Sequence, residues 1–198
     1  MTEISVQSNG LNRRDMLPIP DDDLVLYTFR LHLIAARMVH LRTELDDPSQ
    51  LALLLNAEVP SSWPPGEYDR SAISFFLSRY EESSPQSVGW YAWYAILPAN
   101  AQEAARLVGA AGYFGPPAAD GVVEIGYSVV PESRRQGYGT EVARALTERA
   151  LRLSSVTRVI AHVSDDNISS RIVLERSGFR PVGRVEPGRY RYERAKGQ

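Results

Sequence analysis

Apolar residues alternate with their neighbours in some stretches of the chain and recur at helical spacing in others. Leu31, Leu33 and Ala35 alternate as in a strand, whereas Val142 and Leu146 belong to a repeat at helical spacing. The predicted elements are at least one strand within 24–36, a helix over 47–56, a helix from Asp69 or Ser71 to a break at 83–87, strands at 90–97, 106–114 and 121–130, a helix from Thr140, a strand at 158–163, a helix over 167–177, and a hairpin over 179–193. Consecutive strands at 90–130, joined by turn-like sequence, favour an antiparallel meander.

The segment 58–67 interrupts the helical pattern. Pro60, Pro64 and Pro65 prevent regular structure there, and Trp63 supplies a large indole. A proline-stiffened loop that carries an indole is suited to wall a pocket. Packing as an ordinary surface loop is the alternative interpretation.

The first 23 residues are rich in polar side chains and prolines and end in three aspartates. This composition predicts an extended or mobile leader. Residues 24–198 show no internal repeat, no low-complexity tract and no linker that is long enough to separate domains. We therefore expect a single domain over 24–198.

Composition narrows the class of protein. The 198 residues are 43% hydrophobic, carry a formal net charge of −2 and include no cysteine. The charge favours neither nucleic acid nor an anionic membrane, and the lack of cysteine excludes disulfides and thiolate catalysis. The first residues lack the pattern of a secretory signal, and no apolar run approaches membrane-spanning length. We expect a soluble, cytoplasmic protein.

A strand leads into a glycine-rich, basic helix start between residues 129 and 140. Gly137 and Gly139 allow the backbone to approach an anion, and the N–H groups of a first helical turn lack intrahelical partners. Arg134 and Arg135 add positive charge. The pattern predicts a cradle for a diphosphate, although a Gly-x-Gly after a strand is also consistent with a tight turn.

Two blocks resemble the GCN5-related N-acetyltransferase (GNAT) family. Arg134 to Gly139 is similar to the Arg/Gln-x-x-Gly-x-Gly/Ala signature with which that family binds the pyrophosphate of acetyl-CoA. Asp166 to Phe179 is similar to the later Asn-x-x-Ser…Glu-x-x-Gly-Phe block. The Glu-Ile-Gly-Tyr strand that begins at Glu124, together with Leu174, looks most like the branch that includes ribosomal-protein alanine acetyltransferases.

The resemblance implies a mixed α/β (α+β) fold, with a mostly antiparallel sheet of six or seven strands and about four helices. It implies transfer of the acetyl group of acetyl-CoA to a primary amine of a protein N-terminus or a small molecule, by direct attack in a ternary complex and without a metal. The pantetheine arm would lie along the strand before the cradle like an added strand. The residues implied for the coenzyme are Val129, Val130, Arg134, Arg135, Gln136, Gly137, Tyr138, Gly139, Thr140 and Asn167.

Glu124 is the catalytic residue that the resemblance implies. Amines are mostly protonated near neutral pH, and the family often uses a glutamate at this position, directly or through water, to take the proton. A pairing of Glu124 with a basic neighbour, or simple solvent exposure, is the alternative. The family's usual proton donor is a tyrosine where this chain has Leu174, which leaves Ser170 and Tyr127 as weaker candidates.

Other functional classes fit less well. The glycine pattern lacks the last glycine of a dinucleotide-binding fingerprint and the lysine of a P-loop. His32, His40 and His162 are scattered, which favours core or surface roles over a zinc site. The serious rival is a GNAT-fold protein that binds coenzyme A but acts as a sensor or interaction partner, with Leu174 as the sign of lost catalysis.

The acceptor pocket is expected between the loop 58–67, the aromatic strand 90–94 and the turn 186–190. None of these segments contains a pattern that identifies the acceptor. Core packing together with a homodimer contact is the alternative for the aromatic residues of the strand.

Overall fold

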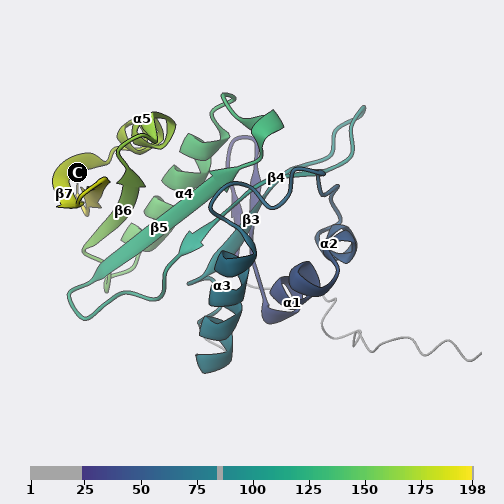
Figure 1. Cartoon of the computed structure of the whole chain (residues 1–198), viewed down its shortest axis with the longest axis horizontal. Coiled ribbons are helices and arrows are strands. Elements are labelled where there is room, and N and C mark those ends of the chain that lie inside the picture. The colour runs from purple at the N-terminus through teal and green to yellow at the C-terminus, as the bar shows by residue number, and fades with distance from the viewer. Residues whose placement is uncertain (1–23, 84–86, 198) are drawn as a thin grey trace, which may run out of the picture.

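The computed structural model describes residues 24–83 and 87–197; the leader predicted over residues 1–23 lies outside the described residues. In chain order the elements are β1 (Val25–Tyr27), β2 (His32–Ala35), α1 (Met38–Asp46), α2 (Pro48–Leu55), α3 (Arg70–Glu82), β3 (Ala92–Leu97), β4 (Arg106–Tyr113), β5 (Val122–Val129), a 3₁₀ turn (Pro131–Ser133), α4 (Tyr138–Arg152), β6 (Arg158–Ser164), α5 (Ile168–Arg176), β7 (Arg180–Glu186) and β8 (Arg189–Ala195). The arrangement is drawn in Figure 1.

The strands form one eight-stranded sheet in the order β1-β2-β3-β4-β5-β6-β8-β7. Among the described strands, β5 and β6 pair in parallel and the other neighbours are antiparallel. The mixed α/β fold and the meander β3-β4-β5 are therefore confirmed. The sheet has eight strands, one more than the larger number expected, because the segment 24–36 forms a short hairpin of two strands, β1 and β2.

The helix α1 was not predicted, and its composition explains why. Its buried residues are His40, Leu41 and Glu44, so two of the three inward positions are polar. Periodicity of apolar residues cannot reveal such a helix. The caps of the predicted helices are confirmed: Asp47, Asp69 and Asn167 accept hydrogen bonds from the backbones of α2, α3 and α5.

The helices lie on two faces of the sheet (Figure 1). One core joins Val123 and Ile125 of β5 to Val142 and Leu146 of α4. The second core joins β3 and β4 to α1, α2 and α3 on the opposite face. Over β5, β6 and β8 this opposite face is only partly buried, so polar side chains remain accessible there beside the helices. Among the described residues, no helix has both the length and the apolarity needed to cross a membrane.

Candidate active site

β5 and β6 separate part of the way along their length. They pair only from Val122–Arg158 to Glu124–Ile160, although β5 runs on to Val129 and β6 to Ser164. Beyond Glu124 the two strands diverge towards their carboxyl ends (Figure 1). Two unpaired strand edges therefore face each other, and an extended ligand between them would have backbone partners on both sides.

The backbone of β5 alternates between its two neighbours. The carbonyl of Glu124 accepts from the N–H of Phe114, on the β4 side, so the groups of Ile125, Tyr127 and Val129 point towards β6. The Val129 carbonyl accepts from Nε of Arg134 at 3.0 Å.

Val130 differs from the expectation that it offers backbone groups to the coenzyme. Its N–H donates to the carbonyl of Val108 and its carbonyl accepts from the N–H of Ser133, both at 3.0 Å. The alternation of the strand turns this residue towards β4. Val129 is therefore the residue at this end of β5 whose carbonyl faces the diverging edge.

The amino end of α4 presents a turn of free helical donors. Gly137 is the N-cap residue, with φ 85° and ψ 0°, and the N–H of Glu141 makes the first helical bond to its carbonyl at 3.1 Å. The N–H groups of Tyr138, Gly139 and Thr140 lie ahead of that bond, so they have no partner within the helix. With the helix dipole, these groups form a site suited to an anion.

The two glycines of the cradle differ in what they do. Gly137 has a left-handed backbone, and a Cβ there would lie 3.3 Å from Nη2 of Arg30. A Cβ at Gly139 would meet Cγ2 of Val173 at 3.5 Å, an ordinary contact. The left-handed backbone thus favours glycine at Gly137, whereas the space at Gly139 accommodates a Cβ.

The remaining cradle residues lie mostly on the surface. Arg134, Arg135 and Gln136 are exposed, and Arg135 adopts a φ of 60°, which is rare for a residue with a side chain. Tyr138 is buried, and the guanidinium carbon of Arg30 lies 4.5 Å from its ring centroid. Tyr138 therefore has only its backbone to offer an anion.

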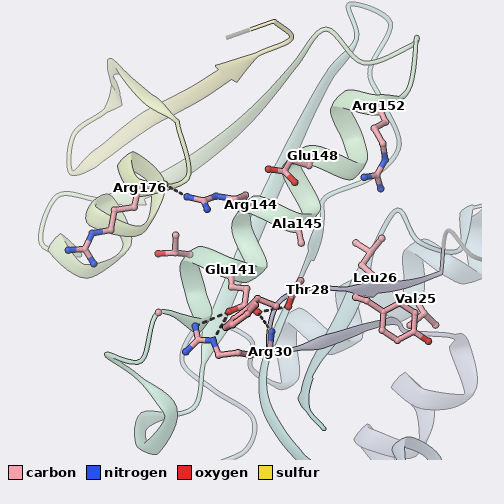
Figure 2. Close-up of a pocket in the computed structure, with 14 residues that line it drawn as sticks. Val25, Leu26, Thr28, Arg30, Glu141, Arg144, Ala145, Glu148, Arg152 and Arg176 are labelled. Carbon is pink, nitrogen blue, oxygen red and sulfur yellow. Dashed lines mark hydrogen bonds and ion pairs between the residues drawn. The ribbon is translucent and has the colours of Figure 1, made fainter.

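The turn between β1 and β2 braces this helix end, a role that sequence patterns did not predict. Nε and Nη2 of Arg30 contact Oε2 of Glu141 at 2.9 and 2.8 Å (Figure 2). Nη1 of Arg30 donates to the carbonyl of Gln136 at 2.8 Å. The hydroxyl of Thr28 also donates to Glu141. Burial raises the pKa of Glu141, but these hydrogen bonds outweigh it and hold the pKa below its ordinary value.

A cavity of about 700 Å³ lies between this turn and α4. It begins at Gly137 and Thr140 and continues past Arg144 to Arg152, with Arg176 on its rim (Figure 2). Nη2 of Arg144 donates to the carbonyl of Arg176 at 2.8 Å, which joins α4 to the end of α5. The cradle therefore opens into a space with several cationic side chains.

The later sequence block is mainly structural. Oδ1 of Asn167 accepts from the N–H of Ser170 at 3.0 Å and so caps α5. Leu174 is in the core. Tyr127 reaches α5, where its hydroxyl lies 2.9 Å from Oγ of Ser170, and burial raises the pKa of this tyrosine. The two alternative proton donors are thus in contact with each other.

Glu124 lies on the partly buried face, at the point where β5 and β6 separate. Its Oε1 is 2.7 Å from Nδ1 of His162 on β6 and 4.0 Å from Nη2 of Arg189 on β8. The pairing with a basic neighbour, which the sequence left open, is therefore present. His162 was assigned to the core or surface from sequence because the partner lies 38 residues away.

Hydrogen bonds to Glu44 hold the predicted loop 58–67 beside the partly buried face of the sheet. Nε1 of Trp63 donates to Glu44 at 2.6 Å, and the hydroxyls of Tyr68 and Tyr94 donate to the same carboxylate at 3.0 and 2.7 Å. Burial raises the pKa of Glu44, although the three donors oppose that shift. Burial, assisted by the Arg37 charge, lowers the pKa of nearby His40 to about 4, so His40 is neutral at physiological pH.

Other contacts place the same loop against the strand that leads to the cradle. The hydroxyl of Ser62 donates to Glu132 in the 3₁₀ turn at 2.8 to 2.9 Å. A Cβ at Gly66 would lie 2.8 Å from Oγ of Ser128, so the loop backbone touches β5. In the aromatic strand, Trp93 and Tyr94 are fully buried, which supports the core-packing interpretation. Among residues 24–83 and 87–197, no group of three or more His, Asp or Glu side chains is arranged to hold a metal.

Comparison with known proteins identifies the family of this chain. Residues 37–180 match the family described as acetyltransferase (GNAT) domain. The chain is 29% identical over 156 residues to a protein of Bacillus subtilis (strain 168) named as the uncharacterized N-acetyltransferase YjdG, which covers 79% of this chain and 89% of that protein.

Solved structures share the fold at lower identity. An acetyltransferase of the GNAT family from Bacillus anthracis superimposes with a TM-score of 0.58 at 18% identity, over 88% of this chain and 99% of that one. The ribosomal L7/L12 alpha-N-protein acetyltransferase RimL, in complex with coenzyme A, has a TM-score of 0.56 at 16% identity, over 86% and 97% of the two chains. The family match covers most of the chain, and the diverging ends of β5 and β6 and the free N–H groups at the amino end of α4 agree with it. The chain belongs to the GNAT family of acetyltransferases.

Proposed function

We propose that this protein is an acetyl-CoA-dependent N-acetyltransferase that acts on a primary amine of a protein N-terminus or a small molecule. The observation that carries the proposal is the geometry of β5 and β6. The amino end of α4, with its free N–H groups, lies where the two strands have diverged. The carboxylate of Glu124 lies where their pairing ends. An extended coenzyme that reached from the amino end of α4 to Glu124 would bring its thioester close to a candidate general base.

The chain's own residues fit such a coenzyme. The N–H groups that follow Gly137, together with Arg134 and Arg135, suit a diphosphate. The Val129 carbonyl would exchange its bond to Arg134 for an amide N–H of the pantetheine arm. The cavity that starts at Gly137 and Thr140 offers space and cationic side chains for the remaining nucleotide part.

Transfer requires a neutral amine and a protonated leaving group. Glu124 is the carboxylate that promotes removal of the amine's proton, either as the base itself or through a neighbouring group, as the new N–C bond forms and the C–S bond breaks. The thiolate is then protonated by water or by the Tyr127–Ser170 pair. With no cysteine in the chain, direct attack within a ternary complex is the expected route.

The acceptor would enter over the partly buried face, between Glu124 and the loop that carries Ser62 and Gly66. The RimL structure is named for its action on a ribosomal protein, and we propose peptide N-termini as the first acceptors to try. Polyamines and aminoglycosides form the second set. A cytoplasmic location stays a prediction from sequence.

Release of free thiol from acetyl-CoA in the presence of these amines tests the function. We expect amine-dependent release with initial-rate patterns that intersect, as a ternary complex requires. Acetyl-CoA binding without release for any amine would favour the sensor alternative. Absence of binding would reject both functions.

A further inference from the structure

The contact between Glu124 and His162 spans the two diverging strands. His162 lies two residues beyond Ile160, the last residue of β6 that pairs with β5. The two side chains therefore meet where the paired segment ends and the unpaired edges begin. They are 28% and 17% exposed, respectively, so both are accessible from the acceptor face.

The chemistry of the contact fixes the tautomer of the imidazole. An ionised carboxylate only accepts hydrogen bonds, so Nδ1 of His162 carries the proton and donates to Glu124. In a neutral imidazole the lone pair is then on Nε2. A proton that arrives at Nε2 gives an imidazolium, which the adjacent carboxylate stabilises.

The charged groups around the pair lie on β8. Arg191 is the register partner of His162 on β8, and its Nη2 lies 3.4 Å from Oε2 of Glu193. Arg189, also on β8, is 4.0 Å from Oε1 of Glu124. The helices α4 and α5 pack against the opposite face of the sheet, with Val142 and Leu174 in its core. Arg189 is therefore a cation beside Glu124, whereas Arg191 is engaged by Glu193.

We infer, on the basis of the proposed function, that His162 is the catalytic residue that accepts the proton and that Glu124 is its positioning residue. The amine's proton moves to Nε2 as the N–C bond forms. It then passes to solvent, while the departing thiolate takes up one proton. The overall reaction is amine plus acetyl-CoA to acetylated amine plus free thiol.

The kinetic test compares His162→Gln and His162→Ala with His32→Gln, which alters a partly buried strand histidine on β2, away from the pair. At saturating acetyl-CoA, we expect kcat of His162→Gln to fall about 100-fold, within the range for loss of a general base. His32→Gln should keep the wild-type rate. Added imidazole should restore part of the activity of His162→Ala, and all variants should bind acetyl-CoA with wild-type affinity by calorimetry.

A second measurement does not depend on turnover. Long-range ¹H–¹⁵N spectra should show the Nδ1–H tautomer of His162 in the wild type and loss of that preference in Glu124→Ala. An Nε2–H tautomer, or an active wild type with His162→Gln within twofold of its kcat, would overturn the inference alone. A wild type that binds acetyl-CoA but acetylates no amine would overturn the proposed function and this role together.

Discussion

The proposed coenzyme side and the proposed acceptor side of this protein are built in different ways. The coenzyme side, formed by β5, residues 130–137 and α4, consists of consecutive residues that present backbone groups. The acceptor side, formed by α1, the loop 58–67 and β3, is held by side chains from distant positions, such as Glu44 and Tyr94. A backbone site tolerates many side chains but few changes of conformation, whereas a side-chain site depends on each partner.

The largest expected effect is on the coenzyme side, with Gly137→Glu. A carboxylate about 4 Å from a phosphate costs about 4 kcal/mol near a protein surface, which is more than two orders of magnitude in affinity. We expect calorimetry to detect no acetyl-CoA binding, while circular dichroism shows a folded protein. Gly188→Glu is the matched control, since Gly188 also has a positive φ, 83°, and has open space around it. Wild-type affinity in Gly137→Glu would reject the cradle.

The next largest effect is on the acceptor side, with Glu44→Ala. The change removes the acceptor of three buried or half-buried donors, from Trp63, Tyr68 and Tyr94. We expect a loss of about 3 kcal/mol in the free energy of unfolding, measured in urea. Glu44→Gln keeps the shape and one acceptor oxygen, so its loss should be smaller. Equal losses in both variants would show that the hydrogen bonds do not set the stability.

The two sides should respond to pH in opposite directions. The folded pKa of Glu44 lies above its ordinary value of 4.5, so its contribution to stability is lost as the pH rises through the interval between them. The folded pKa of Glu141 lies below 4.5, so its contribution is lost as the pH falls towards that folded pKa. In urea unfolding curves from pH 3 to 8, we expect Glu44→Gln to remove the loss of stability that occurs as the pH rises. We expect Glu141→Gln to remove the loss of stability that occurs as the pH falls. If both variants changed the pH dependence of the free energy of unfolding in the same direction, the opposite pKa shifts of Glu44 and Glu141 would be contradicted.

The smallest effects separate the two glycines of the cradle. Gly137→Ala must place a Cβ on a left-handed backbone, which costs about 1 to 2 kcal/mol. Gly139→Ala adds a helix-favouring methyl group in ordinary contact with Val173, so we expect a gain of about 0.5 to 1 kcal/mol. Thermal unfolding of the two variants measures the difference. Destabilisation by Gly139→Ala would mean that α4 and α5 are packed more tightly than the contact distance indicates.

Local patterns predicted most of the fold. The strand before the cradle, the caps of α2, α3 and α5, and the final hairpin lie close to their predicted positions, since each depends on neighbours in sequence. The helix α1 escaped prediction because His40 and Glu44 occupy its buried face. Val129 and Val130 were expected to serve the coenzyme together, but the pairing of β5 with β4 turns Val130 towards β4.

The sequence by itself determined the amino end of α4, with the free N–H groups that we propose bind an anion, since Gly137 and the residues after it specify a backbone conformation within a few positions. Only the tertiary structure decided which side chains form the acceptor side. The pairs Glu124–His162 and Glu44–Tyr94 join residues 38 and 50 positions apart. Their contacts depend on strand register and on the packing of α1 against the sheet, which no local pattern encodes.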